Sequence, residues 1–217
     1  MNDADGLRGR TARTIRSMPA TPPLILGSTS RYRRELLERL RLPFTCVAPQ
    51  VDETPLAGEA PAAMALRLAL AKAQAVATLH PQAVVIGSDQ VADLHGQPIG
   101  KPGSHERAAA QLRRMSGQQV VFQTAVAVVC ASSGFSEAAL APVTVQFREL
   151  SDIEIERYLR LDQPYDCAGS AKSESLGITL LAAIYSDDPT ALIGLPLIRT
   201  CELLRRAGID PLAGPAA

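Results

Sequence analysis

The feature that most constrains the fold of this sequence is an unbroken apolar run, AVVIG, at residues 83–87. A strand without polar alternation is typical of a sheet that is covered on both faces, usually by helices. Segments with helical periodicity precede this run. Leu36, Leu37 and Leu40 fall on one helical face. A long Ala/Leu-rich segment begins at Pro61, a favoured first-turn residue. The sequence therefore predicts an α/β fold.

Signals of further elements follow along the chain. Ser151 and Glu154 form a capping box that opens a helix, and Ser104 is a favourable N-cap for another helix that ends before Gly117. Because the middle of the chain is rich in strand signals, we expect a mixed sheet instead of a purely parallel one. Strands are predicted at residues 24–26, 44–47, 83–87, 120–130, 143–147 and 178–181, and helices at about 31–40, from 61, 104–115, from 151 and 196–207.

The size of the chain suits one domain. With 217 residues, 47% of them hydrophobic, it can build one sizeable core or at most two closely packed lobes. Residues 1–21 contain no continuous apolar segment, which excludes a secretory signal. We interpret them as a disordered extension, or as the product of a start codon upstream of Met18, and expect residues 22–213 to form the domain. No apolar run reaches the ~20 residues that span a bilayer, so no membrane partner is expected.

Charges and cysteines exclude several classes of function. Lys and Arg number 22, as do Asp and Glu, so the chain lacks the diffuse positive field that non-specific nucleic-acid binding needs, although a local cluster of donors can still bind a small anion. The four cysteines are widely separated, and three stand in apolar surroundings, as buried free thiols do. Disulfides or a zinc site are the weaker interpretation. We therefore expect a cytoplasmic protein.

Four polar clusters stand at the edges of apolar elements, and each has a structural as well as a functional interpretation. In the first, Gly27–Ser30 precedes a helix that carries Arg33. Hydroxyls, free N–H groups and a guanidinium group suit a phosphate chain, but an N-cap before a solvated helix face is the commoner arrangement. In the second, Asp52 and Glu53 are adjacent loop carboxylates, which can hold a divalent cation or form a solvated turn.

The third cluster places a carboxylate, Asp89, directly after the apolar run. Ligands bind at the carboxyl ends of strands in open α/β sheets. Asp89 therefore orients a metal or takes a proton from an attacking water, or it only caps a turn. Lys101 follows in a stiff loop from which it can reach a phosphate. The fourth cluster, AGSAKSE, combines small residues with Lys172 and Glu174 and, taken alone, is typical of a surface loop.

Taken in order, several segments resemble the Maf family, and more narrowly its YceF-like branch, the 7-methyl-GTP pyrophosphatases. They are LILGSTSRYRRELL, VDETP, KAQAVA, VIGSDQVA, GKPG, MSG, CAGSAKSESLGI and DPTALIGLPLI. The resemblance runs from about Pro22 to Leu212. It implies a two-lobed Maf/ITPase-like α/β fold with an elongated mixed β-sheet, flanking helices and a central cleft, commonly in a homodimer. It also implies a divalent metal cation, Mg²⁺ or Mn²⁺, and hydrolysis of a nucleoside triphosphate between its α and β phosphates.

The resemblance assigns roles to individual residues. Asp89 falls on the proton acceptor, and Glu53 falls on an acidic position near the metal, so both are expected to hold it. The expected substrate-binding residues are Ser28, Ser30, Tyr32, Arg33, Lys72, Gln90, Lys101, Lys172 and Glu174.

Three of these positions are thought to set base preference in the branch: Tyr32, Gln90 and Glu174. N7-methylation gives guanine a positive charge, which an aromatic face attracts. A carboxylate accepts hydrogen bonds from the guanine N1–H and amine. The related dTTP/UTP branch has Arg and Lys at the first two positions, which Gln90 speaks against. Arg31 and Tyr32 stand where the 7-methyl-GTP branch usually has Pro and Trp.

We therefore predict a pyrophosphatase that releases a nucleoside monophosphate and pyrophosphate and prefers 7-methyl-GTP. Asp89 would deprotonate the attacking water, and the charges of Arg33, Lys72 and Lys101 would balance the pyrophosphate. Two alternatives stay open. One is a house-cleaning enzyme for other modified or canonical nucleotides, such as dTTP, UTP or CTP. The other is a nucleotide-binding regulator of septum formation with weak hydrolysis, although a sensor has no need of the general base.

Overall fold

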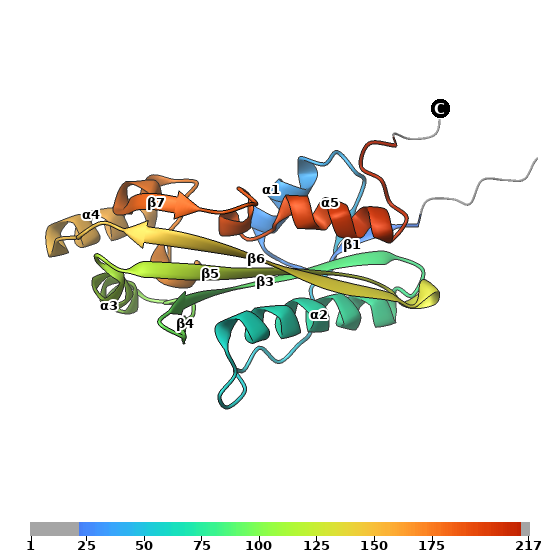
Figure 1. Cartoon of the computed structure of the whole chain (residues 1–217), viewed down its shortest axis with the longest axis horizontal. Helices are drawn as coiled ribbons and strands as arrows, with labels where there is room; N and C mark the ends of the chain where they lie inside the picture. The colour runs from blue at the N-terminus through green and yellow to red at the C-terminus, as the bar shows by residue number, and fades with distance from the viewer. Residues whose placement is uncertain (1–21, 214–217) are drawn as a thin grey trace, which may run out of the picture.

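The computed structural model describes residues 22–213, which form one seven-stranded mixed sheet with five α-helices around it (Figure 1). The extension predicted at residues 1–21 lies outside the described residues. The strands are β1 (Leu24–Leu26), β2 (Thr45–Cys46), β3 (Val84–Leu94), β4 (Gln97–Ile99), β5 (Gln119–Cys130), β6 (Phe135–Phe147) and β7 (Leu181–Tyr185). The helices are α1 (Arg31–Glu38), α2 (Pro61–Leu79), α3 (His105–Met115), α4 (Asp152–Asp162) and α5 (Leu197–Arg206).

The strands lie in the order β2-β1-β3-β5-β6-β7, with β4 paired to β3. β1 is parallel to both β2 and β3, and the other pairs are antiparallel, which confirms the mixed sheet. The predicted helix starts are confirmed as well. Ser104 caps α3, and Ser151 and Glu154 form the capping box of α4.

Strand β3 corrects one expectation. Asp89 was predicted at the carboxyl end of a strand that stops at Gly87, but β3 continues to Leu94. The reason is that β5 supplies an antiparallel partner along the whole of β3, with Asp89 opposite Ala125. The parallel neighbour β1 does end early, since its last residue, Leu26, pairs with Ile86. Asp89 is therefore within its own strand but beyond the end of the parallel part of the sheet.

The strand predicted at 178–181 is wrong. Residues Leu176–Leu180 form a 3₁₀ helix, and β7 begins at Leu181. A short apolar run has no periodicity that separates a strand from a helical turn. Here the chain is tightly folded, because a side chain at Gly177 would come 2.5 Å from the Lys172 carbonyl oxygen.

The cysteine prediction is half right. All four cysteines are free thiols, but only Cys130 is buried; Cys46 is exposed, and Cys167 and Cys201 are partly buried. Cys46 and Cys167 lie in short strand or loop segments near the surface, where apolar sequence neighbours do not ensure burial.

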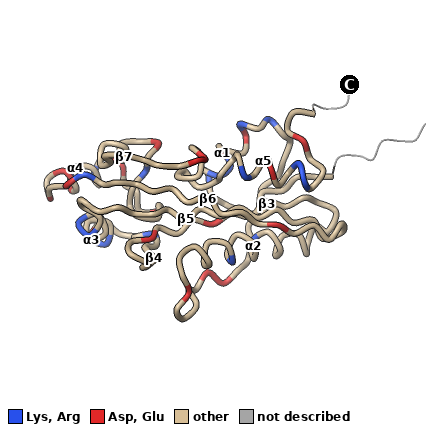
Figure 2. The backbone as a smooth tube through the Cα atoms, in the orientation of Figure 1, with Lys and Arg blue, Asp and Glu red and all other residues tan. Residues whose placement is uncertain are grey.

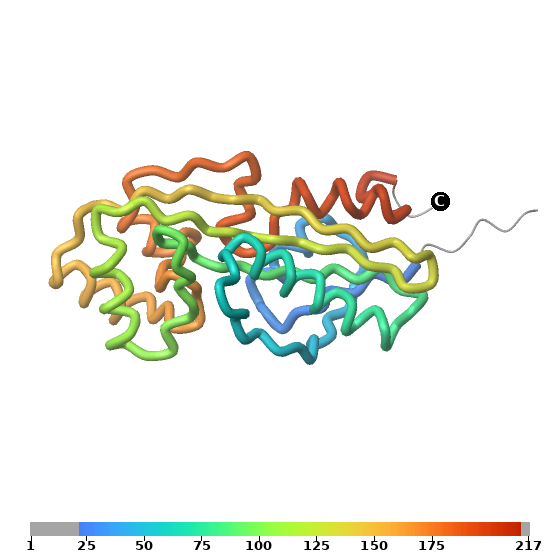
Figure 3. The backbone as a smooth tube through the Cα atoms, turned by 60° about the horizontal axis from the view of Figure 1, so that its bottom comes forward, coloured from blue at the N-terminus to red at the C-terminus, as the bar shows by residue number. Residues whose placement is uncertain are grey.

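Helices cover both faces of the sheet, as the apolar run predicted (Figures 1 and 3). On one face, α2 packs an alanine-rich surface against β3 and β5. On the other, Leu36 and Leu37 of α1 and Leu203 and Leu204 of α5 pack against β1, β3 and β5. Helices α3 and α4 lie toward the opposite end of the sheet from α5. Charged residues of both signs occur along the chain, with basic ones on α1, α3 and α5 (Figure 2).

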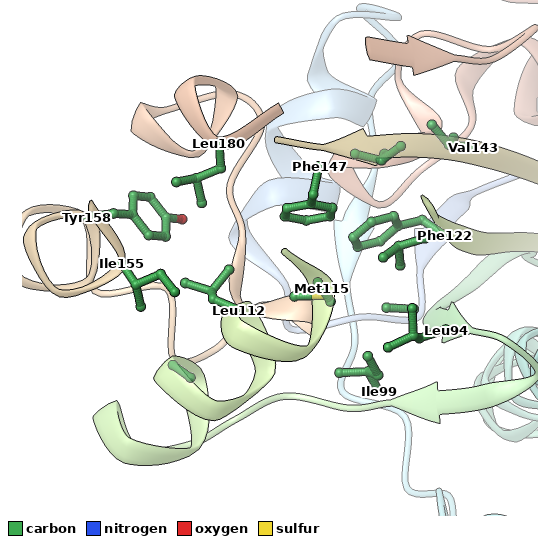
Figure 4. Close-up of a cluster of buried hydrophobic side chains, with 14 of the residues drawn as sticks. Leu94, Ile99, Leu112, Met115, Phe122, Val143, Phe147, Ile155, Tyr158 and Leu180 are labelled. Carbon is green, nitrogen blue, oxygen red and sulfur yellow. The ribbon is translucent and has the colours of Figure 1, made fainter. Parts of the chain in front are cut away.

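A second core fills the end of the sheet that α3 and α4 cover (Figure 4). Phe122 and Phe147 extend from β5 and β6 toward Met115 of α3, while Tyr158 of α4 closes the far side. This distal core, defined by the residues that α3 and α4 pack on β5 and β6, is built from large side chains.

By length and composition, α2 is the one helix within residues 22–213 that could cross a membrane. Arg67 and Lys72 interrupt its apolar residues, which is why no continuous apolar run is visible in the sequence. In the fold, α2 is a core helix: its alanines pack on the sheet, and Lys72 is buried in ion pairs.

Candidate active site

A pocket of about 470 Å³ lies beyond the end of β1. It is lined by the loop after β1, the start of α1, and residues of α2, β3 and the loop before α5. Most of the residues that the sequence predicts for the site line this pocket together: Ser28, Ser30, Tyr32, Arg33, Glu53, Lys72, Gln90, Lys101 and Glu174.

The centre of the site is a lysine held between two carboxylates. Lys72 Nζ lies 2.6 Å from Asp89 Oδ1 and 2.7 Å from Glu53 Oε1. Lys72 and Asp89 are both buried, whereas the Glu53 side chain is 58% exposed at the pocket. Asp89 does not line the pocket itself but contacts Lys72, which does. Buried charges of this kind persist only when they are paired.

Close packing between α2 and β3 brings Lys72 to Asp89. Gly87 makes this approach possible, because a side chain there would come 2.2 Å from the Ala69 carbonyl oxygen and 2.6 Å from the Ala73 amide nitrogen. Glycine is the residue that allows two backbones to meet at this distance.

The ionisation of Glu53 reflects its cationic surroundings. Burial raises its pKa, but the hydrogen bond and charge of Lys72 act in the opposite direction and outweigh it. Lys101 and Arg33 add further positive charge, so the pKa of Glu53 lies below its ordinary value. Glu53 is therefore an anion at neutral pH.

The first polar cluster, Gly27–Ser30 with Arg33, is both a helix N-cap and part of the pocket wall. Ser30 is the N-cap of α1, since its Oγ accepts a hydrogen bond from the Arg33 N–H at 3.4 Å. The expected solvated face is wrong for Arg33, which is partly buried and donates from Nε to the Gly194 carbonyl at 2.9 Å. Burial lowers the pKa of Arg33, while the negative charge of Asp89 opposes that shift. Arg34 does occupy the solvated face.

Tyr32 forms part of the pocket wall beside a second guanidinium. The Arg31 guanidinium lies 4.7 Å from the centre of the Tyr32 ring, and its Nη2 donates to the phenol oxygen at 2.8 Å. Burial raises the pKa of Tyr32 to about 12, so the phenol is neutral at physiological pH. Arg31, which the sequence analysis gave no role, therefore covers part of the aromatic face predicted for the base.

Of two substrate-binding residues predicted in the fourth polar cluster, only one lines the pocket. Glu174 lines the pocket, as the base-preference prediction requires. Lys172 is not among the lining residues; its Nζ donates to the Asp162 carbonyl at 2.9 Å, toward the end of α4. The pocket also contains Asp166 and Cys167, which sequence reasoning missed because neither stands in a recognisable polar cluster.

The carboxylates of the site fit a divalent cation through two protein ligands. Within residues 22–213 no group of three or more His, Cys, Asp or Glu side chains gathers to hold a metal. Asp89 and Glu53 nevertheless converge on one cationic nitrogen. Mg²⁺ is commonly bound through one or two carboxylates together with substrate phosphates, so this pair suits a metal that arrives with a nucleotide.

Comparison with known proteins identifies the family. The profile of the Maf-like protein family matches residues 23–207, nearly all of the described chain. The chain belongs to the Maf family. The match spans the loop after β1, the Lys72 carboxylate cluster and the loop before α5, so the whole pocket lies within the part of the chain shared with the Maf family.

Three relatives named 7-methyl-GTP pyrophosphatase are similar to this chain over most of its length. A Polaromonas protein named 7-methyl-GTP pyrophosphatase is 69% identical over 191 residues, covering 88% of this chain and 87% of the relative. Proteins of the same name from Albidiferax ferrireducens and Bordetella pertussis are 63% and 61% identical, covering 90% and 92% of this chain and 98% and 100% of their own lengths.

Proposed function

We propose that this protein is a nucleoside triphosphate pyrophosphatase that cuts the bond between the α and β phosphates and prefers 7-methyl-GTP. The observation that carries the proposal is the contact of Lys72 with both Asp89 and Glu53. The same pocket is lined by side chains that can donate hydrogen bonds to phosphate oxygens. The names of the Maf relatives support the same reaction and substrate.

Asp89 acts as the general base. Its carboxylate is buried and fixed by Lys72, so its orientation is set before a substrate arrives. A positioned carboxylate that takes a proton from the attacking water contributes typically 10²–10⁴-fold to the rate. The water attacks the α-phosphorus, and pyrophosphate leaves.

The cations of the pocket stabilise the negative charge that develops on the leaving pyrophosphate. Arg33 is held in place by the Gly194 carbonyl, and Lys101 lies on the pocket wall. Ser28 and Ser30, with free N–H groups at the start of α1, complete the phosphate cradle. Preorganised donors of this kind supply most of the rate in phosphoryl chemistry.

Asp89 and Glu53 would hold Mg²⁺ or Mn²⁺ together with the substrate phosphates. When bound, the metal supplies Lewis-acid stabilisation of charge on the phosphoryl oxygens. Lys72, which contacts both carboxylates, keeps them close to each other when no metal is bound.

The base is recognised in the same pocket by Tyr32, Gln90 and Glu174. The carboxylate of Glu174 favours a cationic base and accepts from the guanine edge. The phenol ring of Tyr32 offers cation–π attraction, for which the Arg31 guanidinium competes. Lys172 contributes only if its ammonium leaves the Asp162 carbonyl.

Three further expectations, on the shape of the site, the location of the protein and its oligomeric state, belong to the same proposal. The pocket serves as the central cleft between two lobes of the elongated fold, with the distal core in one lobe. The protein acts in the cytoplasm. It forms a homodimer, as the family resemblance implies.

The test is pyrophosphate release with Mg²⁺ or Mn²⁺ from 7-methyl-GTP, GTP, dTTP, UTP, CTP and ITP. We expect the highest kcat/KM with 7-methyl-GTP and a loss of about 10²–10⁴-fold in Asp89→Asn, with nucleotide affinity nearly unchanged. Glu53→Gln should raise the metal concentration needed for half-maximal rate. Asp52→Asn is its matched control, because Asp52 is exposed, does not line the pocket and accepts from the Thr54 N–H.

The alternatives predict other results. Equal rates on dTTP, UTP or CTP would assign a broader house-cleaning enzyme. Tight nucleotide binding without release would assign a binding regulator of septum formation. Full turnover by Asp89→Asn would show that the general base is misassigned.

A further inference from the structure

Residues 188–194 belong to the loop that joins β7 to α5, and the backbone of this segment reaches the pocket at more points than the Gly194 carbonyl that holds Arg33. Gln90 Nε2 lies 3.0 Å from the carbonyl oxygens of both Ala191 and Leu192, and 2.8 Å from Thr124 Oγ1. Carbonyl oxygens can only accept hydrogen bonds. The nitrogen of the Gln90 amide, and not its oxygen, must therefore face the loop.

This orientation decides what Gln90 offers to a ligand. Within residues 22–213, Gln90 Oε1 accepts no hydrogen bond, and it is not among the buried polar atoms that lack a partner. Since Gln90 is only partly buried and lines the pocket, its oxygen is accessible there. The loop thus turns Gln90 into a hydrogen-bond acceptor for the base, suited to an N–H or amine edge.

The same loop positions the phosphate end of the pocket. The Gly194 carbonyl accepts from Arg33 Nε at 2.9 Å and from Ser88 Oγ at 3.0 Å. Gly194 has φ 126°, a conformation that favours glycine. Arg33 Nη1 then lies 3.5 Å from Ser28 Oγ. Three backbone carbonyls of one loop therefore orient side chains at both ends of the site.

A buried carboxylate, Asp188, holds this loop to α5. Asp188 is 1% exposed. Its Oδ1 accepts from the Thr190 hydroxyl at 2.8 Å, and its Oδ2 accepts from the Ile198 N–H at 2.8 Å and the Arg199 N–H at 3.4 Å. The latter two groups belong to the first turn of α5, where a negative charge is favourable. The carboxylate thus ties the start of the loop to the helix that follows it.

We propose that Asp188 is a positioning residue for base recognition. By clamping the 188–194 loop to α5, it fixes the carbonyls that aim the Gln90 oxygen at the base and hold Arg33 beside Ser28. Asp188 acts through these residues and does not touch the substrate. The inference rests on the proposed function, since it concerns the substrate preference of the same pocket.

The test measures the ratio of kcat/KM for 7-methyl-GTP to that for UTP in Asp188→Asn. The new amide nitrogen replaces one carboxylate oxygen, so it faces either the Thr190 N–H, which lies 3.2 Å from Oδ1, or the Ile198 and Arg199 N–H groups at Oδ2. Because two donors cannot pair, the loop shifts. We expect this ratio to fall about tenfold, as for the loss of roughly one hydrogen bond to the base. Asp187→Asn is the matched control, because Asp187 is exposed and, among residues 22–213, pairs with Arg199 alone; it should keep the wild-type ratio.

A second variant covers the case in which Asp188→Asn does not fold. Thr190→Val removes the hydroxyl that lies 2.8 Å from both Asp188 Oδ1 and the Leu195 carbonyl oxygen and accepts from the Leu197 N–H, and it should lower the same ratio. Thr190→Ser keeps the hydroxyl and should restore it. In a Gln90→Ala background, Asp188→Asn should lower the ratio no further, because the group it positions is gone.

Two results would overturn the inference while leaving the proposed function intact. One is a folded Thr190→Val or Asp188→Asn protein with the wild-type ratio, even if its melting temperature is lower. The other is an equal loss with and without the Gln90 side chain. If the wild-type protein releases no pyrophosphate from any nucleotide, the proposed function itself fails and the inference fails with it.

Discussion

Two interfaces of the sheet, the one with α2 beside the pocket and the distal core under α3 and α4, are packed in different ways. Beside the pocket, α2 lies on β3 and β5 through alanines, and Gly87 has no side chain at all. In the distal core, Phe122, Phe147 and Met115 fill the space between the sheet and α3. The first interface buries little volume per residue but brings backbones close together, whereas the second buries much more volume per residue.

The two kinds of packing have different consequences, one for the free energy of unfolding and the other for the positions of catalytic side chains. Burial of large apolar side chains supplies most of the favourable free energy of a core. An interface of small residues supplies less, but it fixes the distance between two backbones, and with it the contact between Lys72 on α2 and Asp89 on β3. The distal core should therefore contribute more to the free energy of unfolding than the α2 interface does, and the α2 interface should matter more for catalysis.

The largest expected effect on stability is in the distal core. Phe147→Ala removes a side chain that is 1% exposed, and such truncations lower the free energy of unfolding by about 3–5 kcal/mol. The rate per folded molecule should not change, because Phe147 does not line the pocket. Urea unfolding and active-site titration measure the two quantities. Phe147→Leu should lose less stability; a large fall in its turnover per folded molecule would contradict the separation.

A smaller loss of stability but a larger loss of activity is expected at the α2 interface. The methyl group of Gly87→Ala would meet backbone atoms of Ala69 and Ala73, so α2 must shift, at about 1–3 kcal/mol for overpacking. Displacing Lys72 by about 1 Å should lower kcat roughly 100-fold.

Gly134→Ala is the matched control for this substitution. Its φ is 71°, so alanine is strained there by about 1 kcal/mol, but no atom lies within 4 Å of the added methyl group. It should lose stability in urea and keep full activity. If both glycine variants lost activity in proportion to stability, close packing at Gly87 would have no special part in catalysis.

Local signals predicted the elements whose ends are fixed by their own residues. The apolar run 83–87 predicted a sheet covered on both faces, and the capping residues Ser104 and Ser151 mark the true starts of α3 and α4. The length of β3 was not predictable in this way. It depends on pairing with β5, some forty residues later in the chain, which no local pattern encodes.

The residues of the site likewise divide into those that the sequence predicts and those that depend on long-range contacts. Side chains with distinctive chemistry, such as Asp89 and Lys101, were visible in the sequence, and the family resemblance supplied their grouping. What stayed hidden are contacts made by backbone or by long-range packing. The Gly194 carbonyl has no signature in the sequence, and Arg33 was expected in part on a solvated face because its partner lies 161 residues away.

The smallest expected effect is the acid sensitivity of α4 in the distal half. Hydrogen bonds from the Ser151 N–H and hydroxyl, and from Arg148, hold the pKa of Glu154 at about 2. Because this value is lower than in the unfolded chain, Glu154 stabilises the fold above its ordinary pKa, and that contribution is lost as the pH falls toward 2. Glu154→Gln should therefore be less stable than wild type at pH 7, and the difference should vanish near pH 2.

Urea unfolding at a series of pH values between 7 and 2 measures this change, and turnover at neutral pH should be unaltered. Glu53, whose pKa is also lowered, is the counterpart beside the pocket. Glu53→Gln should lower stability at neutral pH in the same direction but should also impair turnover, because Glu53 contacts Lys72. A Glu154→Gln protein that lost activity as Glu53→Gln does would show that the two halves of the sheet are coupled. Unchanged turnover in Glu154→Gln would show that the charge of Glu154 affects the stability of the fold and not catalysis.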